Sequence, residues 1–301
     1  MTGDKSNKPD STQWTIIKLL NWAATYLKTH NIDSPRATGE ILLAHALKCE
    51  RIALYLNYDQ PLIGDELKAF KSLIQRRIRR EPVAYILGVK EFWSLDFEVT
   101  REVLIPRPET ECLVETALDI LSGHEPSQPW CILDMGTGSG AIIIALAVEQ
   151  PRHTYFASDR SIPAVKVARR NARRHNCGER IHYFNADWLT SLKREKSAFN
   201  MIISNPPYIP TGVIAGLQPE INSYEPTAAL DGSADGLKCF KDIIGAAHRY
   251  LEPDGVLLLE IGHDQSDDVR RLAGDSGHYR DFKCTKDYSG YNRVVSMHKR
   301  D

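Results

Sequence analysis

The chain has 301 residues, of which 42% are hydrophobic and 26% are charged, and its formal net charge is −1. This length is enough for two domains, each with a core of its own. The near-neutral charge argues against non-specific binding to nucleic acid, and no apolar segment is long enough to span a bilayer.

The first residues, Met1 to Ser11, are polar and contain no arginine, which is typical of neither a signal peptide nor a mitochondrial presequence. We expect a frayed tail there. The six cysteines form no Cys-x-x-Cys pair, so neither a zinc site nor a disulfide framework is predicted. We therefore expect a cytoplasmic protein without a bound metal.

Three segments then carry apolar residues at helical spacing, namely 14–30, 35–48 and 65–80. Each helix must bury its apolar face against the others. Residues 1–85 are therefore predicted to form a small helical bundle.

The next part of the chain, 86–111, reads as a connecting segment. Glu91 to Val99 alternates enough to predict a hairpin, and Pro106-Arg107-Pro108 is stiff because proline fixes its own φ. An amphipathic helix after this segment opens the second domain, expected over 112–301.

The second domain begins with a strand, a glycine-rich turn and a helix. The apolar run Trp130–Asp134 leads into a turn at 136–140 with the spacing Gly-x-Gly-x-Gly, and Ala141–Glu149 has helical character. Glycines at such a turn allow a nucleotide to approach the backbone at a helix N-terminus. The dinucleotide pattern Gly-x-Gly-x-x-Gly stays open, because Ala141 occupies the next place.

Two further strands end in polar residues. Thr154–Ser158 is followed by Asp159, and an acidic residue at this point accepts hydrogen bonds from ribose hydroxyls in such folds. Ile181–Asn185 is followed by Asp187 and Trp188. Each has a plainer interpretation, a solvated turn carboxylate for Asp159 and a core aromatic for Trp188. Because both residues follow strands that come after the glycine turn, Asp159 and Trp188 together favour an adenosine pocket.

The most informative segment is a strand from Phe199 that stops in Asn205-Pro206-Pro207-Tyr208. Two prolines end the ladder and stiffen the loop, and their backbone offers carbonyl oxygens without N–H donors. The Asn205 amide oxygen and the Pro206 carbonyl can accept both hydrogens of a planar NH2 group while Tyr208 packs on its face. Side-chain amides and exocyclic base amines both have this shape. The alternative is a strand that ends in a Pro-Pro turn beside a packed tyrosine.

The remaining chain alternates again between helical and strand patterns. Residues 209–236 show little periodicity and are expected to form a lid over a site. A helix over 237–251, a buried strand over 256–261 and two final strands follow. Alternating strands and helices predict an α/β fold with a mostly parallel sheet.

The motifs together resemble a known class of enzymes. The turn with Asp134 before it, the acidic residues at 159 and 187, and the tetrapeptide at 205–208 look like class I S-adenosylmethionine-dependent methyltransferases that alkylate planar nitrogens. Three further segments, 80–88, 104–111 and 224–230, look like the release factor glutamine methyltransferase family. The resemblance runs from about Trp14 to the last strand.

The resemblance implies a Rossmann-like sheet of seven strands with the last one antiparallel, beside the helical bundle. It implies methyl transfer from S-adenosyl-L-methionine, which becomes S-adenosyl-L-homocysteine, to the glutamine amide in the Gly-Gly-Gln motif of peptide chain release factors. The residues expected to bind the donor are Gly136, Thr137, Gly138, Ser139, Gly140, Asp159, Asp187, Trp188 and Asn205. The residues expected to hold and activate the target are Asn205, Pro206, Pro207, Tyr208 and Arg107.

By the same resemblance, the bundle grips the release factor. Arg107 and Thr110 lie near the methyl donor and the target pocket, and Glu109 or Glu111 caps the next helix. A domain-interface ion pair is the alternative role for Arg107. We expect a monomer that does not act on nucleic acid. A methyltransferase for base amines of RNA or DNA is the second hypothesis, because it would use the same loop. A nucleoside-binding protein without catalysis is the third.

Overall fold

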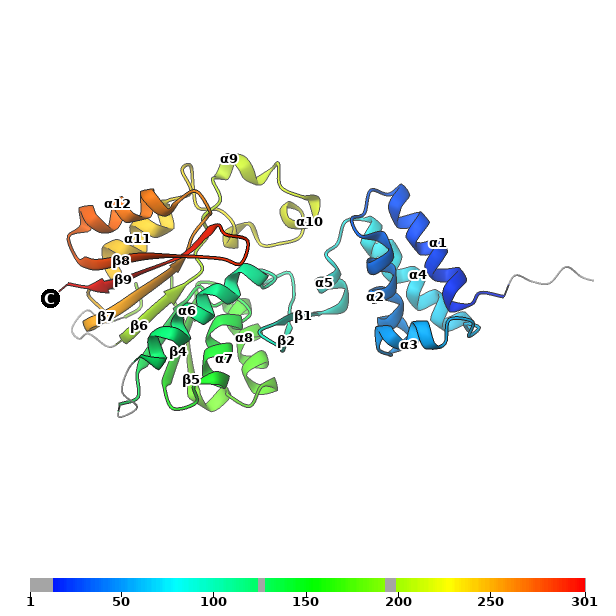
Figure 1. Cartoon of the computed structure of the whole chain (residues 1–301), viewed down its shortest axis with the longest axis horizontal. Coiled ribbons are helices and arrows are strands. Elements are labelled where there is room, and N and C mark those ends of the chain that lie inside the picture. Colours follow the sequence, from blue (N-terminus) through cyan, green and yellow to red (C-terminus); the bar gives the residue numbers. More distant parts are fainter. Residues whose placement is uncertain (1–12, 124–127, 193–198, 301) are drawn as a thin grey trace, which may run out of the picture. The chain divides into compact units, whose positions relative to one another are not determined.

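A computed structural model describes residues 13–123, 128–192 and 199–300 (Figure 1). The expected tail at Met1 to Ser11 lies outside these residues. The chain divides into two compact units, one that ends at Leu87 and one that begins at Gly88. None of the helices in the described ranges is long and apolar enough to cross a membrane.

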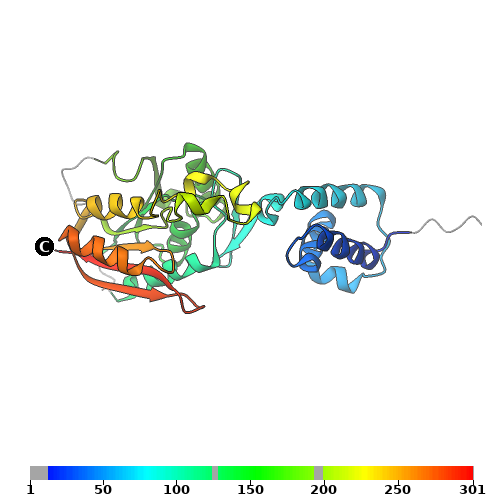
Figure 2. The same cartoon turned by 90° about the horizontal axis from the view of Figure 1, so that it is seen from above.

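The first unit is the expected helical bundle. Two of its helices were not predicted, because pieces of six and five residues are too short to show a period. In both views α4 lies against α1 and α2 (Figures 1 and 2), and Leu20, Leu43 and Phe70 belong to their shared core. The five helices are α1 (Ile16–Thr29), α2 (Pro35–Leu47), α3 (Arg51–Leu56), α4 (Gly64–Ile78) and α5 (Val83–Leu87).

The second unit opens with the predicted hairpin, β1 (Val89–Phe92) and β2 (Leu95–Glu98), and then forms one seven-stranded sheet. The strand order is β5-β4-β3-β6-β7-β9-β8, and β9 runs antiparallel to both of its neighbours. The predicted topology, with the last strand antiparallel, is therefore confirmed. The sheet strands are β3 (Cys131–Met135), β4 (Thr154–Asp159), β5 (Ile181–Asn185), β6 (Phe199–Ser204), β7 (Leu251–Glu260), β8 (Tyr279–Lys286) and β9 (Asn292–Lys299).

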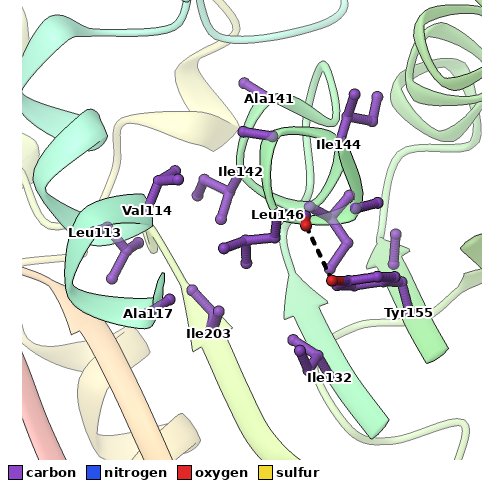
Figure 3. Close-up of a cluster of buried hydrophobic side chains, with 14 of the residues drawn as sticks. Leu113, Val114, Ala117, Ile132, Ala141, Ile142, Ile144, Leu146, Tyr155 and Ile203 are labelled. Carbon is purple, nitrogen blue, oxygen red and sulfur yellow. Dashed lines mark hydrogen bonds between the residues drawn. The ribbon is translucent and has the colours of Figure 1, made fainter. Parts of the chain in front are cut away.

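Helices cover both faces of this sheet. On one face, Leu113 and Val114 of α6 and Ile142 of α7 pack over Ile132 and Ile203 of the strands (Figure 3). The opposite face carries a second core formed with α11 and α12. The helices are α6 (Glu111–Ser122), α7 (Ala141–Glu149), α8 (Ile162–Arg174), α11 (Lys238–Ala247) and α12 (Ser266–Ser276).

Two of these helices differ in how they begin. Ser161 caps α8, because its Oγ accepts a hydrogen bond from the Ala164 N–H at 3.2 Å. The expected cap of α6 by Glu109 or Glu111 is not present: the Thr110 N-cap position has no side-chain cap bond, and Glu111 instead accepts from the Trp93 N–H at 2.8 Å. That bond ties the hairpin to α6.

Five parallel strands end at one edge of the sheet, and this edge positions the site. Gly136 follows β3, Asp159 ends β4, Asp187 lies two residues past β5, Asn205 follows β6 and Glu260 ends β7. In open α/β sheets, ligands bind at the carboxyl ends of the strands. The segment 209–236, which includes α9 (Thr211–Ile214) and α10 (Pro219–Asn222), leaves from the same edge.

Candidate active site

A cavity of about 460 Å³ lies at this edge, and we call it the large cavity. Its volume falls in the range of ordinary small-molecule sites. Segments from four strand ends, the connector before α6 and the segment 209–236 contribute to its wall. The predicted site residues that line it are Arg107, Gly136, Thr137, Gly138, Ser139, Asp159, Asp187, Trp188, Asn205 and Pro207.

The glycine turn is held by β4. The N–H groups of Gly136 and Thr137 both donate to the Ser158 carbonyl, each at 2.9 Å. Gly136 has φ +72° and Gly138 has φ +55°, backbone conformations that glycine adopts without strain. A Cβ at Gly136 would lie 3.7 Å from the Trp188 ring, an ordinary contact distance, so the turn passes close to this ring.

Gly140 has a different place from the other glycines. It is not among the residues that line the large cavity. A Cβ at this position would lie 2.8 Å from Ile144 Cδ1 and 3.1 Å from Ala168 Cβ. Gly140 therefore serves the close packing of α7 on α8, and nothing in this geometry assigns it a ligand contact.

Asp159 joins the glycine turn to the start of α8. Its Oδ2 accepts from the Gly138 N–H at 2.9 Å and its Oδ1 from the Ser161 N–H at 2.8 Å. Burial raises the pKa of this carboxyl, and the two backbone bonds counteract that rise. Each carboxylate oxygen keeps a free lone pair for a ligand hydroxyl. The carboxylate is thus partly buried and oriented, not a solvated turn residue.

Asp187 and Trp188 line the large cavity at the end of β5. Trp188 is partly buried, packs against the core under α11, and has φ +50°. Its ring thus belongs to the core and to the cavity wall at once. The two interpretations of this tryptophan from the sequence are compatible.

A smaller cavity of about 120 Å³ adjoins the large one, and we call it the small cavity. Pro206, Tyr208 and Glu260 line the small cavity only, whereas Arg107 and Asn205 line both. Asn205 therefore stands where two ligand spaces meet. This is the arrangement expected of an enzyme that brings a donor and an acceptor together at one residue.

Hydrogen bonds hold the Asn-Pro-Pro-Tyr loop in place. The Asn205 Nδ2 donates to Thr110 Oγ1 at 3.2 Å, and its Oδ1 accepts no bond from the described part of the chain. The Tyr208 carbonyl accepts from Gln265 Nε2 at 3.0 Å, and the Tyr208 hydroxyl donates to Glu260 Oε1 at 3.4 Å. The loop thus presents a fixed amide oxygen beside a fixed aromatic ring.

Arg107 is held by Glu225 of the segment 209–236. Their ion pair is 2.5 Å long, and Glu225 also accepts from the Ile105 N–H at 3.2 Å. The Glu225 side chain is only 1% exposed. Arg107 thus forms an ion pair, as its alternative role required, and the pair joins the connector to the segment 209–236 within the second unit.

Glu260 is a site residue that the sequence analysis missed. Burial raises its pKa to about 7, with opposing effects from hydrogen bonds of Thr110 and Tyr208 and from the positive charge of Arg293. The sequence did contain a signal for it, because Glu260 is the one charged residue of the otherwise apolar stretch 256–261. A charge at that position of a buried strand is costly unless it has a role or a partner.

Two family matches and several relatives agree on what the chain resembles. The PrmC N-terminal domain family matches residues 18–88, and the methyltransferase small domain family matches residues 115–215. A release factor glutamine methyltransferase of Geobacter sulfurreducens is 42% identical over 94% of this chain and 96% of its own length. The enzyme of that name from Chlorobaculum tepidum is 39% identical over 96% of this chain and 98% of its own.

The chain belongs to the release factor glutamine methyltransferase family. The family predicted from the motifs is thereby confirmed, and the chain is a methyltransferase. Solved structures with the same fold include a methyltransferase from Pyrococcus furiosus, with a TM-score of 0.51 at 17% identity, which covers 75% of this chain and 99% of its own. The hMettl16 catalytic domain, solved with an RNA hairpin, has a TM-score of 0.56 at 14% identity and covers 81% of this chain and 86% of its own. At such low sequence identity, the similarity to these two structures supports the fold and nothing about the reaction.

Proposed function

We propose that the protein transfers a methyl group from S-adenosyl-L-methionine to the side-chain amide nitrogen of the glutamine in the Gly-Gly-Gln motif of peptide chain release factors. The observation that carries the proposal is the position of Asn205, which lines both the large and the small cavity. The large cavity receives the methyl donor in this account, and the small cavity receives the glutamine side chain.

The residues of the large cavity fit the donor. The bare backbone at Gly136 and Gly138 admits a close-lying ligand, the Asp159 carboxylate accepts from ribose hydroxyls, and Trp188 offers an aromatic wall. When bound, S-adenosylmethionine supplies an activated methyl group on a sulfonium. Asp187 and Asn205 complete the polar lining.

The residues of the small cavity make the amide nitrogen reactive by orienting it. An amide nitrogen is a poor nucleophile because its lone pair is delocalised into the carbonyl. The Asn205 Oδ1 and the Pro206 carbonyl accept its two hydrogens, which raises the electron density on nitrogen and aims its lone pair at the large cavity. Alignment of this kind contributes up to about 7 to 11 kcal/mol in favourable cases. Carbonyl dipoles also favour the positive charge that develops on nitrogen as the methyl–sulfur bond breaks. The nitrogen then releases one of its two protons to water, and the products are the N-methylated amide and S-adenosyl-L-homocysteine.

The two units of the chain have different roles in this account. We assign the recognition of the release factor to the bundle of residues 1–85, linked through 86–111 to the donor-binding catalytic domain of residues 112–301. A monomer in the cytoplasm that acts on protein and not on nucleic acid fits this account. The names of the relatives with 42% and 39% identity support a release factor as the substrate.

The test is incubation with methyl-labelled S-adenosylmethionine and one of three acceptors: a release factor, the same factor with its motif glutamine changed to alanine, or total RNA. Label on the unaltered factor alone supports the proposal. Label on RNA and not on the factor would establish the second hypothesis, methylation of a base amine, in its place.

A further inference from the structure

Two exposed tyrosines stand on the turn that joins β8 to β9. Tyr288 is 87% exposed and Tyr291 is 56% exposed. The exposed ring of His263, on the loop after β7, lies beside Tyr291 with the ring centroids 5.8 Å apart and the planes at 75°. We call these three rings the aromatic patch. A single exposed apolar side chain is ordinary, but several on neighbouring loops indicate an interaction surface.

The backbone of this turn is held by one buried carboxylate. Asp287 Oδ1 accepts from the N–H groups of Ser289 and Tyr291, each at 3.0 Å. Its Oδ2 accepts from Arg293 Nη2 at 3.0 Å, and the Asp287 N–H donates to the Tyr291 carbonyl at 2.8 Å. The turn therefore presents its tyrosines on a fixed backbone. Such side chains lose little conformational entropy when they meet a partner.

The turn lies at the edge of the sheet that carries both cavities. Because β9 runs antiparallel to β7, the start of β9 lies beside the end of β7, where Glu260 pairs with Val294. Tyr291 precedes Val294 by three residues, a distance of at most about 11 Å. The Arg293 carbonyl also accepts from the Ile261 N–H at 2.8 Å. The aromatic patch thus adjoins the wall of the small cavity, which Glu260 lines.

The loop that carries His263 supports the site directly. Two residues further along, Gln265 is buried, and its Nε2 donates to the Tyr208 carbonyl at 3.0 Å. The Asn-Pro-Pro-Tyr loop and the aromatic patch therefore rest on the same segment of the chain.

A row of carboxylates on α6 borders the aromatic patch. The Tyr288 hydroxyl donates to Glu115 Oε2 at 2.9 Å. Glu111, Glu115 and Asp119 follow one another at intervals of four residues, and α6 contains no lysine or arginine. We call these three residues the acidic row. Like charges at this spacing destabilise a helix, so the acidic row costs stability unless a cationic partner faces it.

We propose that the aromatic patch and the acidic row dock the protein that carries the target glutamine, through a segment with arginine or lysine side chains. The proposal rests on the proposed function and adds to it a surface of the second unit outside the two cavities. The glutamine enters the small cavity, so the chain on either side of it passes over the adjoining surface. An arginine there stacks on a tyrosine ring while its charge meets the carboxylates, and both residue types are enriched at the energetic centres of protein interfaces.

The first test is the Kd of the release factor for the full-length protein, measured by isothermal titration calorimetry with S-adenosyl-L-homocysteine present. In the Y288A/Y291A double variant we expect this Kd to rise roughly tenfold or more, as for the loss of interface anchors. V148A is the control, because Val148 is a partly exposed apolar residue near the end of α7, and its Kd should stay at the wild-type value. A wild-type Kd for S-adenosyl-L-homocysteine in each variant shows that the site is folded.

Charge provides a readout that a merely structural role would not move. E115Q/D119N keeps two amide oxygens as acceptors but removes two negative charges. We expect its Kd for the release factor to exceed that of wild type roughly threefold or more at about 50 mM salt, and the difference to shrink at about 500 mM, where exposed charges are screened. A Kd that responds neither to these substitutions nor to salt would overturn the assignment of a cationic segment.

Failure of this proposal is distinguishable from failure of the proposed function. If the Y288A/Y291A protein binds and methylates the factor with wild-type Kd and KM, the docking surface is refuted and the function stands. If the factor binds through the aromatic patch but receives no methyl group, the function fails and the docking surface stands. A wild-type dimer in analytical ultracentrifugation that dissociates in Y288A/Y291A would assign the patch to a second copy of this chain and overturn the proposal.

Discussion

The guanidinium of Arg107 lies 2.5 Å from the carboxylate of Glu225, a residue 118 positions later in the chain. The pair joins the connector before α6 to the segment 209–236, and Arg107 lines both cavities. Because Glu225 is buried, its two bonds to Arg107 and to the Ile105 N–H hold both segments against the site.

Replacement of Glu225 should therefore loosen the site as well as the fold. E225Q removes the charge that Arg107 needs, and hydrogen bonds to charged groups contribute about 1.5 to 3 kcal/mol. We expect the free energy of unfolding to fall by about 1 to 2 kcal/mol, a moderate loss because the Arg107 side chain keeps some access to water. We also expect a lower kcat/KM for the release factor. Urea denaturation and steady-state kinetics measure both. E179Q, at an exposed position, is the control, and an E225Q protein as stable as this control would contradict the account.

Asp159 is expected to act on donor affinity and not on chemistry. D159A removes an acceptor for ribose hydroxyls and also releases the Gly138 and Ser161 N–H groups. We expect the Kd for S-adenosylmethionine to rise about 10- to 100-fold, which corresponds to about 1.4 to 2.8 kcal/mol. Isothermal titration calorimetry measures this Kd directly, and an unchanged value would exclude a ribose contact.

Gly140 should matter for stability through packing. G140A places a methyl group 2.8 Å from Ile144 Cδ1 at a residue with φ +83°, so it combines a clash with backbone strain. Such changes cost about 1 to 3 kcal/mol. G274A in α12 is the matched control, because a Cβ there meets nothing within 4 Å, and it should raise stability by about 0.5 to 1 kcal/mol. Equal melting temperatures for the two variants would refute the packing role.

The fold was accessible from the sequence wherever a local pattern was long enough. Helices such as α1 and α4 follow from apolar residues at helical spacing, and strands such as β4 follow from short apolar runs with a polar end. The helix α12 was not predicted, because only three of its eleven residues are buried and they form too short an apolar pattern to indicate a helix. The short α3 and α5 carry too few residues to display a period.

The candidate site was predictable where its residues follow strands or stand in motifs, as Asp159 and Asn205 do. The partners of those residues were not. Arg107 meets Glu225, and Asn205 meets Thr110, across 118 and 95 positions of sequence. Such pairings depend on how the strands order themselves in the sheet, and no local pattern encodes that order.

Glu260 makes stability depend on pH. Burial raises its pKa in the folded protein to about 7 from the ordinary value of 4.5. Between these values the folded state holds a proton that the unfolded state has released, so this group contributes stability below pH 4.5 that is lost as the pH rises through 7.

E260Q should remove this dependence. Relative to wild type, its free energy of unfolding should therefore increase by roughly 1 to 3 kcal/mol between pH 5 and pH 8. Denaturant titrations at both pH values measure the difference. Asp134, whose pKa is also raised to about 7, is present in both proteins and cancels in the comparison. A difference that is constant with pH would show that Glu260 is ionised throughout this range.

The central claim is that Asn205 holds the amide nitrogen of a release factor glutamine for methyl transfer. The most direct measurement is mass spectrometry of the release factor after incubation with S-adenosylmethionine and either wild-type protein or N205A. We predict that the wild type adds one methyl group to the motif glutamine. The rate with N205A should be at least 100-fold lower, a loss typical of removing one oriented catalytic hydrogen bond, while N205A still binds the donor. Methylation of that glutamine by N205A at the wild-type rate, or no methylation by the wild type, would contradict the account.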